Sequence, residues 1–291
     1  MKLLLPLLAS VTVCIRSIGI RLFQEKVQKT LRDLQVFQTL YTLFCGVVFL
    51  LLSGFRFPKT GAGLGLAAAF ALCLTSCTIG LSQGLLCGPM SLTSVISSCS
   101  VVMPILFGWL VYRETLGILH LLGIACLLGT FVLTGIGSGE DKKEITPKWV
   151  CMVMMNFLGG GFGAIILSLY NKLPEQGSNN GFMSLSFFGA SVLLAAFTWF
   201  SHRKDRHGEK VRLTKRFFGF VSLAALGCFG TNLLIIHLSG IMPASLLHPL
   251  YNGASGLLMT LISCLLFRER MSWKKAAILL LGICTVVFLN L

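Results

Sequence analysis

The chain has 291 residues, of which 55% are hydrophobic and only 12% are charged. A soluble domain carries about 25% charged residues, so the composition excludes an ordinary soluble protein and indicates an integral membrane protein. The formal net charge of +14 would suggest nucleic acid in a soluble protein, but here the basic residues lie almost wholly in short connections, where the positive-inside rule explains them, and we expect no nucleic-acid partner.

Ten apolar segments, each long enough to cross a bilayer as a helix, follow one another along the chain. They cover approximately residues 3–22, 34–53, 62–86, 90–112, 116–137, 149–170, 182–201, 217–239, 243–267 and 273–290. The leucine-rich start resembles a signal peptide, but no A-x-A cleavage site follows it, so we expect it to remain as the first helix. Several connections are very short, which makes the neighbouring helices antiparallel. No connection is long enough to hold a soluble domain.

The basic residues are distributed unequally between the two sides of the predicted membrane protein. Eighteen lysines and arginines lie in the connections between segments one and two, five and six, seven and eight, and nine and ten, whereas five lie on the opposite side. Cytoplasmic loops carry such an excess, which places both termini outside. We expect a multi-pass protein of the cell (plasma) membrane.

The ten segments divide into two groups of five, residues 1–139 and 140–291. Because five spans is an odd number, two homologous halves of this kind lie upside down relative to each other. The predicted fold is therefore an all-α integral membrane protein, with ten transmembrane helices in two inverted five-helix repeats.

The fourth segment of each half begins near a proline and ends with an Arg-Glu pair, Arg113-Glu114 in the first half and Arg268-Glu269 in the second. In the first half a leucine and two glycines follow this pair (Leu116, Gly123 and Gly129). With the length and the five-plus-five layout, these features resemble the drug/metabolite transporter superfamily, in its ten-helix EamA-like branch. The resemblance covers nearly the whole chain, although the second half has Ile278 at the position of the first glycine. It implies a secondary transporter of small metabolites or drugs, often outward, through a cavity between the halves.

The ninth segment carries the densest polar face. His248, Asn252 and Ser255 are spaced i, i+4, i+7 and share one side of a helix, with Tyr251 beside them. Polar side chains in a lipid-length segment must face protein or a water-filled cavity. Pro249 lacks an N–H, so we expect the helix to be kinked or opened there, with carbonyls available to a ligand. Alternatively, His248 meets interfacial water and Asn252 forms an interhelical hydrogen bond.

Arg16 is the one basic residue well inside a predicted span. Inserting a guanidinium there costs roughly 3 kcal/mol. Two roles stay open: binding an anionic group, or snorkelling toward the side on which Arg21 lies. Of the two, we prefer snorkelling.

Other polar side chains also lie within apolar segments. A weaker copy of the polar face in the ninth segment is formed by Thr93, Ser97 and Ser100. Asn232 and Gln83 could add hydrogen-bonding groups to a central cavity. Asn156 precedes a glycine-rich stretch that favours close packing over a hinge. We expect segments three, four, eight and nine to line the cavity, with segments one and six as moving walls. The candidate substrate-binding residues are His248, Tyr251, Asn252, Ser255, Asn232, Ser97, Ser100, Gln83, Asn156 and Arg16.

The charged residues of the predicted spans indicate which charge a transported solute would carry. No acidic residue lies inside a predicted span, so a lipophilic cation would find no counter-ion, and neutral, zwitterionic or weakly anionic solutes are favoured. For Glu114 and Glu269 we expect a structural salt bridge or a loop cap in preference to proton coupling. His248 is a candidate carrier of a coupling proton, because the pKa of an ordinary histidine lies near neutral pH.

Motifs of enzymes, metal sites and nucleotide-binding sites are missing from the sequence. The eleven cysteines are scattered and show no zinc-binding spacing. We therefore expect no cofactor, no metal and no enzymatic activity. The predicted function is secondary transport of a small metabolite or drug-like solute, with export favoured, by a monomer or weak dimer. The alternatives are a lipid-headgroup flippase or membrane-embedded transferase, and a non-transporting scaffold or sensor.

Overall fold

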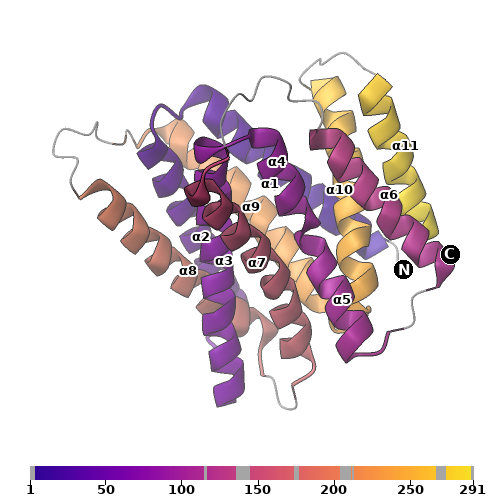
Figure 1. Cartoon of the computed structure of the whole chain (residues 1–291). Coiled ribbons are helices and arrows are strands. Elements are labelled where there is room, and N and C mark those ends of the chain that lie inside the picture. Colours follow the sequence, from indigo (N-terminus) through magenta and orange to yellow (C-terminus); the bar gives the residue numbers. More distant parts are fainter. Residues whose placement is uncertain are drawn as a thin grey trace.

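The computed structural model describes residues 4–114, 117–135, 145–173, 177–203, 211, 213–266 and 273–289. These residues form one helical bundle without strands, with α8 at one edge and α6, α10 and α11 at the other (Figure 1). The elements are α1 (Leu4–Lys26), α2 (Leu31–Ser53), α3 (Gly61–Cys87), α4 (Met90–Ser98), the 3₁₀ turn η1 (Cys99–Val101), α5 (Val102–Val111), α6 (Ile118–Gly135), α7 (Pro147–Asn171), α8 (Asn179–His202), α9 (Lys215–Leu238), α10 (Ala244–Leu266) and α11 (Trp273–Phe288).

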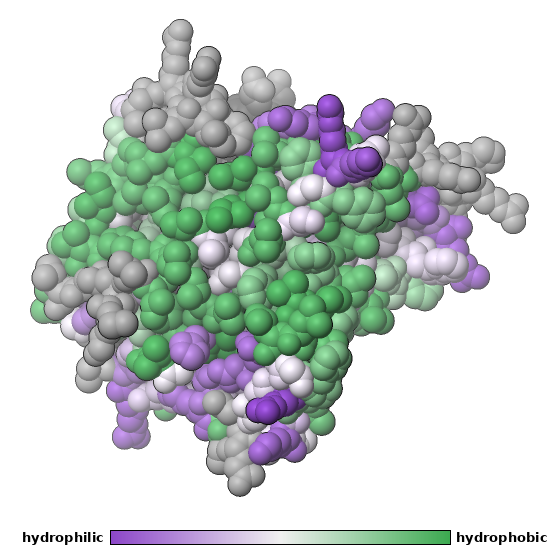
Figure 2. Space-filling view, turned by 180° about the vertical axis from the view of Figure 1, so that it is seen from behind, coloured by the Kyte–Doolittle hydropathy of each residue, from purple (hydrophilic) through white to green (hydrophobic). Residues whose placement is uncertain are grey.

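Seven helical segments among the described residues are long and apolar enough to cross a membrane. They are α1, α2, α3, the α4–α5 segment, α7, α8 and α9, and two further apolar helices, in α6 and α11, are shorter. A broad hydrophobic band crosses the face in Figure 2, with hydrophilic side chains above and below it. Large apolar side chains such as Leu110 and Val192 are exposed. Soluble monomers rarely expose apolar surface on this scale, so the structure fits a multi-pass membrane protein.

Hydroxyl side chains cap the starts of five long helices. At each start the Ser or Thr oxygen accepts a hydrogen bond from the backbone N–H three residues later, which satisfies a donor that the helix leaves free. The capping residues are Thr30, Thr60, Thr146, Ser178 and Thr214. These caps begin the helices one to three residues before the apolar segments predicted from the sequence.

The predicted fourth segment, 90–112, is not one uninterrupted helix. It consists of α4, the turn η1 and α5. At the turn, Ser100 packs against α7, where a Cβ added to Gly160 would meet the Ser100 Oγ at 3.0 Å. A 3₁₀ stretch within a longer helix is often found at a hinge.

Helix α1 packs closely against α9. A Cβ on Gly19 would lie 2.9 Å from the backbone nitrogen of Ala224, and one on Gly227 would overlap the backbone of Arg16 and lie 2.7 Å from the Thr12 oxygen. Glycine at both positions therefore lets the two backbones approach each other.

Helix α3 packs against α7 in the same manner. A Cβ on Gly80 would lie 2.6 Å from the backbone nitrogen of Asn156, and one on Gly159 would lie 2.8 Å from that of Cys77. Across the rest of the bundle, α2 packs against α8 and α6 against α11, while α10 contacts α1, α5 and α11.

Two stacked aromatic pairs close two helix hairpins. Phe23 and Phe37 stack at 4.0 Å between α1 and α2, with Phe217 of α9 edge-on against them. The corresponding pair between α7 and α8 is Tyr170 and Phe182, whose centroids lie 3.9 Å apart, with Phe70 of α3 against Phe182. All of these rings are buried.

Glu114 caps the start of α10. Pro243 precedes this helix and has no side chain that can cap it, and instead the Glu114 carboxylate accepts hydrogen bonds from the Ser245 N–H (3.2 Å) and the Ser245 hydroxyl. Arg113 takes a left-handed conformation with φ 52°, so that the Glu114 N–H bonds the Gly108 carbonyl and ends α5. The expected cap is found, on a helix distant in sequence. Arg268 and Glu269 lie outside the described residues.

Removing this cap should destabilise the protein. We expect Glu114→Ala to lower the free energy of unfolding by about 1 kcal/mol, as loss of other helix caps does. The control is Glu25→Ala, which removes an acid that forms an exposed ion pair with Arg21. Thermal unfolding in detergent should show the larger loss for Glu114→Ala, and equal losses would contradict the capping role.

Candidate functional site

A cavity of about 210 Å³ lies where six helices, α1, α2, α3, α8, α9 and α10, meet midway along the bundle. We call it the central cavity. Its lining combines an apolar wall with hydroxyl, amide, thiol and guanidinium groups. The lining residues are Val13, Arg16, Tyr41, Thr42, Leu74, Cys77, Thr78, Phe187, Ala190, Leu194, Cys228, Thr231, Asn232, Ile235, Tyr251 and Asn252.

Arg16 supplies the charge of this cavity. The polar groups around its guanidinium are the Cys228 thiol and the hydroxyls of Tyr41 and Tyr251. Its Nε atom is buried and has no hydrogen-bond partner among the described residues, and none of the lining residues is acidic. A guanidinium away from water is costly unless it is paired. The cavity therefore favours a negatively charged group.

Arg16 also borders a shallow groove of about 620 Å³ along α1, which Arg21 and Glu25 line as well. These two residues form an ion pair of 3.0 Å. The preferred interpretation from the sequence, that Arg16 only snorkels toward Arg21, accounts for this groove but not for the central cavity. Arg16 stands between the two spaces.

The polar side chains of α9 are held in place by their own helix. Asn232 Nδ2 donates to the Cys228 carbonyl at 2.8 Å and lies 3.6 Å from the Cys228 sulfur. Thr231 donates to the Gly227 carbonyl, and its hydroxyl lies 2.9 Å from that of Thr12 in α1. A site whose side chains are already fixed loses less conformational entropy when a ligand binds.

Of the kink or opening expected at Pro249, the opening is not found, because α10 continues through this residue as an α-helix. Asn252 Nδ2 donates to the His248 carbonyl at 2.8 Å, which places an amide next to the proline. From α1, Ser10 donates to the Tyr251 carbonyl at 3.1 Å. The Ser10 bond joins α1 and α10 beside the cavity, where Tyr251 and Asn252 form part of the lining.

His248 and Ser255 share the helix with these residues but lie outside the central cavity. His248 is 4% exposed, its Nε2 has no hydrogen-bond partner among the described residues, and its ring packs edge-on against Tyr251 at 5.7 Å. Ser255 lines a separate cavity of about 370 Å³, which also touches α6 and α11 and which shares Val13 and Asn252 with the central one.

Four other predicted residues do not line the central cavity. Ser100 packs on α7, and Asn156 Nδ2 donates to the Cys77 carbonyl at 2.8 Å, in agreement with the packing role that we preferred for it. Ser97 and Gln83 are half-buried in α4 and α3. Segment 90–112 was expected to line the cavity and does not, whereas α2 and α8, which were not expected to line it, do.

Several lining residues were missed from the sequence. Tyr41 and Thr42 lie in the middle of the apolar segment of α2, and Thr78 lies in that of α3. Thr42 and Thr78 donate to carbonyls of their own helices, which makes such residues inconspicuous in an apolar segment. The adjacent polar pair Tyr41-Thr42, far from either helix end, was the signal that could have identified this face.

The structure contains no group of three metal-ligating side chains within the residues it describes. Ten cysteines in that part of the chain are free.

Comparison with known proteins identifies a similar fold but no family. No family model matches the sequence, and no curated protein matches it. Among solved structures, 28 chains are similar. One of these, described only as the crystal structure of a protein, superposes with a TM-score of 0.72 over 99% of this chain and 95% of its own length, at 13% sequence identity. At this identity the likeness establishes the fold alone.

Proposed function

We propose that the chain is a secondary transporter of small solutes, built like members of the drug/metabolite transporter superfamily from ten membrane-spanning helices. Its two inverted halves are residues 1–139 and 140–291, and the central cavity between them carries the solute by alternating access. The protein acts as a monomer in the cell membrane and catalyses no chemical conversion. The observation that carries the proposal is an uncompensated guanidinium in a polar cavity midway along helices of membrane length.

The pairing of the helices supports the two-half arrangement. When the α4–α5 segment is counted as one span, the halves are α1 to α6 and α7 to α11. The first helix of each half then packs against the third helix of the other, as α1 does on α9 and α7 does on α3. The second helices pack together, as α2 and α8, and the fifth helices pack together, as α6 and α11. A pseudo-two-fold axis accounts for all four pairings.

The glycine contacts support the same correspondence. Gly19 approaches Ala224, and Gly159 approaches Cys77, in each case at the backbone nitrogen. The two glycines are 140 residues apart in the sequence, and their two partners are 147 apart. Random packing of helices gives no reason for such matched contacts.

A second pair of contacts has the same spacings. Gly227 approaches the backbone of Arg16, and Gly80 approaches that of Asn156. Arg16 and Asn156 are again 140 residues apart, and Gly227 and Gly80 are 147 apart. Arg16 thus corresponds to Asn156, whose amide is bonded to the Cys77 carbonyl. The two halves have diverged at this position, and only Arg16 faces the central cavity.

The size and lining of the cavity favour a small amphipathic solute. A volume of about 210 Å³ is below the ~300–1,000 Å³ of sites for drug-sized ligands. Arg16 would bind a carboxylate, the Asn232 and Asn252 amides would bind further polar groups, and the wall of Phe187 and Leu194 would contact an apolar part. A zwitterion or weak monoanion satisfies these groups better than a cation.

Solute uptake into proteoliposomes tests the proposal. The panel contains small zwitterions, monocarboxylates, neutral solutes and organic cations, and we expect movement of zwitterions or monocarboxylates. Asn252→Ala should lower the initial rate about five- to tenfold, as loss of one neutral hydrogen bond of about 1 kcal/mol does. The control is Asn180→Ala, at the start of α8 and outside the cavity.

Three outcomes would count against the proposal. If no solute of the panel moves, transport is not the function, and movement of a lipid-linked sugar in the same vesicles would then favour a flippase. Uptake confined to cations would contradict the role of Arg16. Equal rates for Asn252→Ala and its parent would remove Asn252 from the site.

A further inference from the structure

A second pocket, of about 510 Å³, lies between α2 and α8 on the flank of the bundle. We call it the lateral pocket, and it shares no lining residue with the central cavity. Two stripes at helical spacing form it, one on each helix. The lining residues are Arg32, Val36, Thr39 and Leu40 of α2 and Ala195, Thr198, Trp199, His202 and Arg203 at the end of α8.

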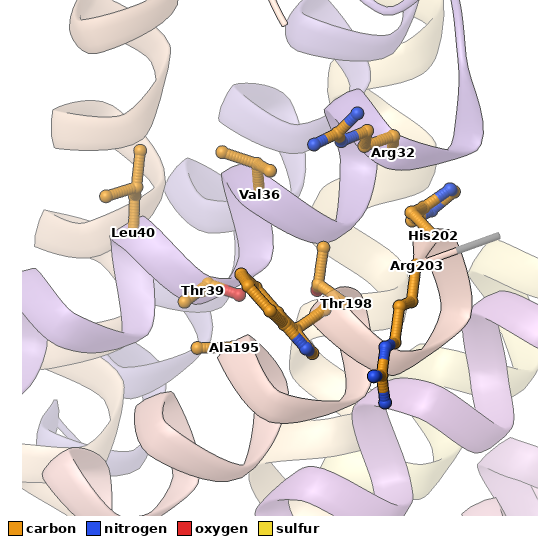
Figure 3. A pocket seen from close by; sticks show the side chains of 9 residues that line it. Arg32, Val36, Thr39, Leu40, Ala195, Thr198, His202 and Arg203 are labelled. Carbon is orange, nitrogen blue, oxygen red and sulfur yellow. The ribbon is translucent and has the colours of Figure 1, made fainter. Parts of the chain in front are cut away.

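The lateral pocket changes from apolar to basic along its length. Figure 3 shows Arg32, His202 and Arg203 at one end and Leu40 and Ala195 toward the other. From Arg32 to Leu40 the chain advances eight residues along α2, which is about 12 Å along the helix. This distance separates the phosphate of a phospholipid from the upper part of its acyl chains.

Two side chains that line the pocket, those of His202 and Thr198, are held by hydrogen bonds. His202 Nε2 and Gln35 Oε1 lie 2.9 Å apart and join α8 to α2. Thr198 donates its hydroxyl proton to the Leu194 carbonyl of its own helix. Within the described part of the chain the one ion pair is Arg21–Glu25, so Arg32 and Arg203 face the pocket without an acidic partner there.

The position of the basic end fits the boundary between membrane and water. It lies at the start of α2 and the end of α8, on the side that the lysine and arginine count places in the cytoplasm. Trp199 and Phe200 are each 69% exposed at this level, where aromatic residues are enriched in membrane proteins. The cytoplasmic leaflet carries the anionic lipids, which attract basic residues next to the membrane.

We propose that the lateral pocket binds one anionic phospholipid. Arg32 and Arg203 bind the phosphodiester from the two sides, and an acyl chain lies along Val36, Leu40 and Ala195. The bound lipid bridges α2 and α8. Because α8 also supplies Phe187, Ala190 and Leu194 to the central cavity, the lipid stabilises one wall of that cavity. The assignment does not depend on which solute the central cavity carries.

Native mass spectrometry of the purified protein tests the assignment, with phosphatidylglycerol or phosphatidylcholine added at matched concentrations. We expect one tightly held phosphatidylglycerol and a higher thermal unfolding midpoint in its presence. Each basic residue near an anionic headgroup accounts for roughly a fivefold change in affinity. The double variant Arg32→Gln/Arg203→Gln should therefore bind phosphatidylglycerol about 25-fold more weakly, while its binding of phosphatidylcholine stays unchanged.

Matched variants distinguish lipid binding in the lateral pocket from a general effect of charge and from misfolding. Arg56→Gln/Lys59→Gln removes the same charge at the opposite end of α2 and should bind lipid as the parent does. Ala195→Trp should displace the lipid by filling the apolar part, whereas Ala196→Trp, also at an exposed position but outside the pocket, should not. Glycerol phosphate without acyl chains should fail to compete.

The assignment is overturned by equal retention of the two lipids, or by parental affinity in the Arg32/Arg203 double variant. Equal losses in the Arg56/Lys59 variant would show a diffuse charge effect and would also overturn it. Competition by glycerol phosphate at lipid concentrations would identify a site for free phosphate esters instead.

Discussion

Arg16→Gln is expected to lower the initial rate of uptake of carboxylate-bearing solutes by about 30-fold or more, and uptake of uncharged solutes far less. The substitution removes the cation of the central cavity and leaves a shorter, uncharged polar side chain. Breaking a buried, hydrogen-bonded charge pair costs about 2 kcal/mol at the low end, which is the source of this factor. The thermal unfolding midpoint should stay the same or rise, because an unpaired guanidinium inside a membrane is itself unfavourable.

Arg21→Gln is the matched control for this prediction. Arg21 lies on the same helix, outside the central cavity, and its exposed ion pair with Glu25 should contribute little. Arg16→Lys should restore part of the rate, because an ammonium keeps the charge without the planar geometry of the guanidinium. Parental uptake in Arg16→Gln, or an equal loss in Arg21→Gln, would show that Arg16 does not bind the solute.

Gly227→Ala and Gly80→Ala should each destabilise the protein, by about 1–3 kcal/mol as other overpacked sites do. A methyl group at Gly227 would overlap the backbone of α1, and one at Gly80 would lie 2.6 Å from the backbone nitrogen of Asn156 in α7. Backbone atoms cannot move aside as a flexible side chain can, so the helix pairs must separate. Thermal unfolding in detergent and the yield of monodisperse protein measure the effect.

Each substitution has a control on its own helix. Gly219 lies on α9 with Gly227, and Gly65 lies on α3 with Gly80, and a Cβ at either control position has no neighbour within 4 Å. Alanine there should leave stability unchanged or raise it by up to about 1 kcal/mol, because alanine favours the helix. If the paired and control variants unfold alike, close backbone packing does not hold these two helix pairs together.

Much of the helix layout could be predicted from hydropathy alone. Nine of the ten apolar segments correspond to single helices, and Ser or Thr caps explain why several begin earlier than the hydropathy indicates. The tenth segment, 90–112, could not be predicted as α4, η1 and α5, because the interruption depends on Ser100 packing against Gly160 of a distant helix. Local composition carries no information about that contact.

The candidate site was predicted in part. Four of the predicted residues meet in the central cavity: Arg16, Asn232, Tyr251 and Asn252. Polar groups within apolar segments tend to face protein or water, which is why they could be predicted. His248 shares a helix with Asn252 but lies outside the lining. Helical spacing identifies residues on one face of one helix, whereas a cavity depends on how the faces of several helices are oriented toward one another.

The hydrogen-bond partner of Glu114 could not be predicted from the Arg-Glu motif alone. The position of Glu114 beside a span predicted a structural salt bridge or a loop cap. That its partner is Ser245, 131 positions later, depends on the tertiary packing of α5 against α10.

Side-specific labelling of two cysteines tests most directly whether the central cavity is a transport path. Cys77 and Cys228 line it and Cys45 is fully buried, so the chain contains its own negative control. A membrane-impermeant thiol reagent is added to right-side-out or to inside-out vesicles, and peptide mass spectrometry measures the labelling of each cysteine. Alternating access predicts labelling of Cys77 and Cys228 from both sides, slowed by a transported solute. Labelling from one side only, or from neither, would contradict the account.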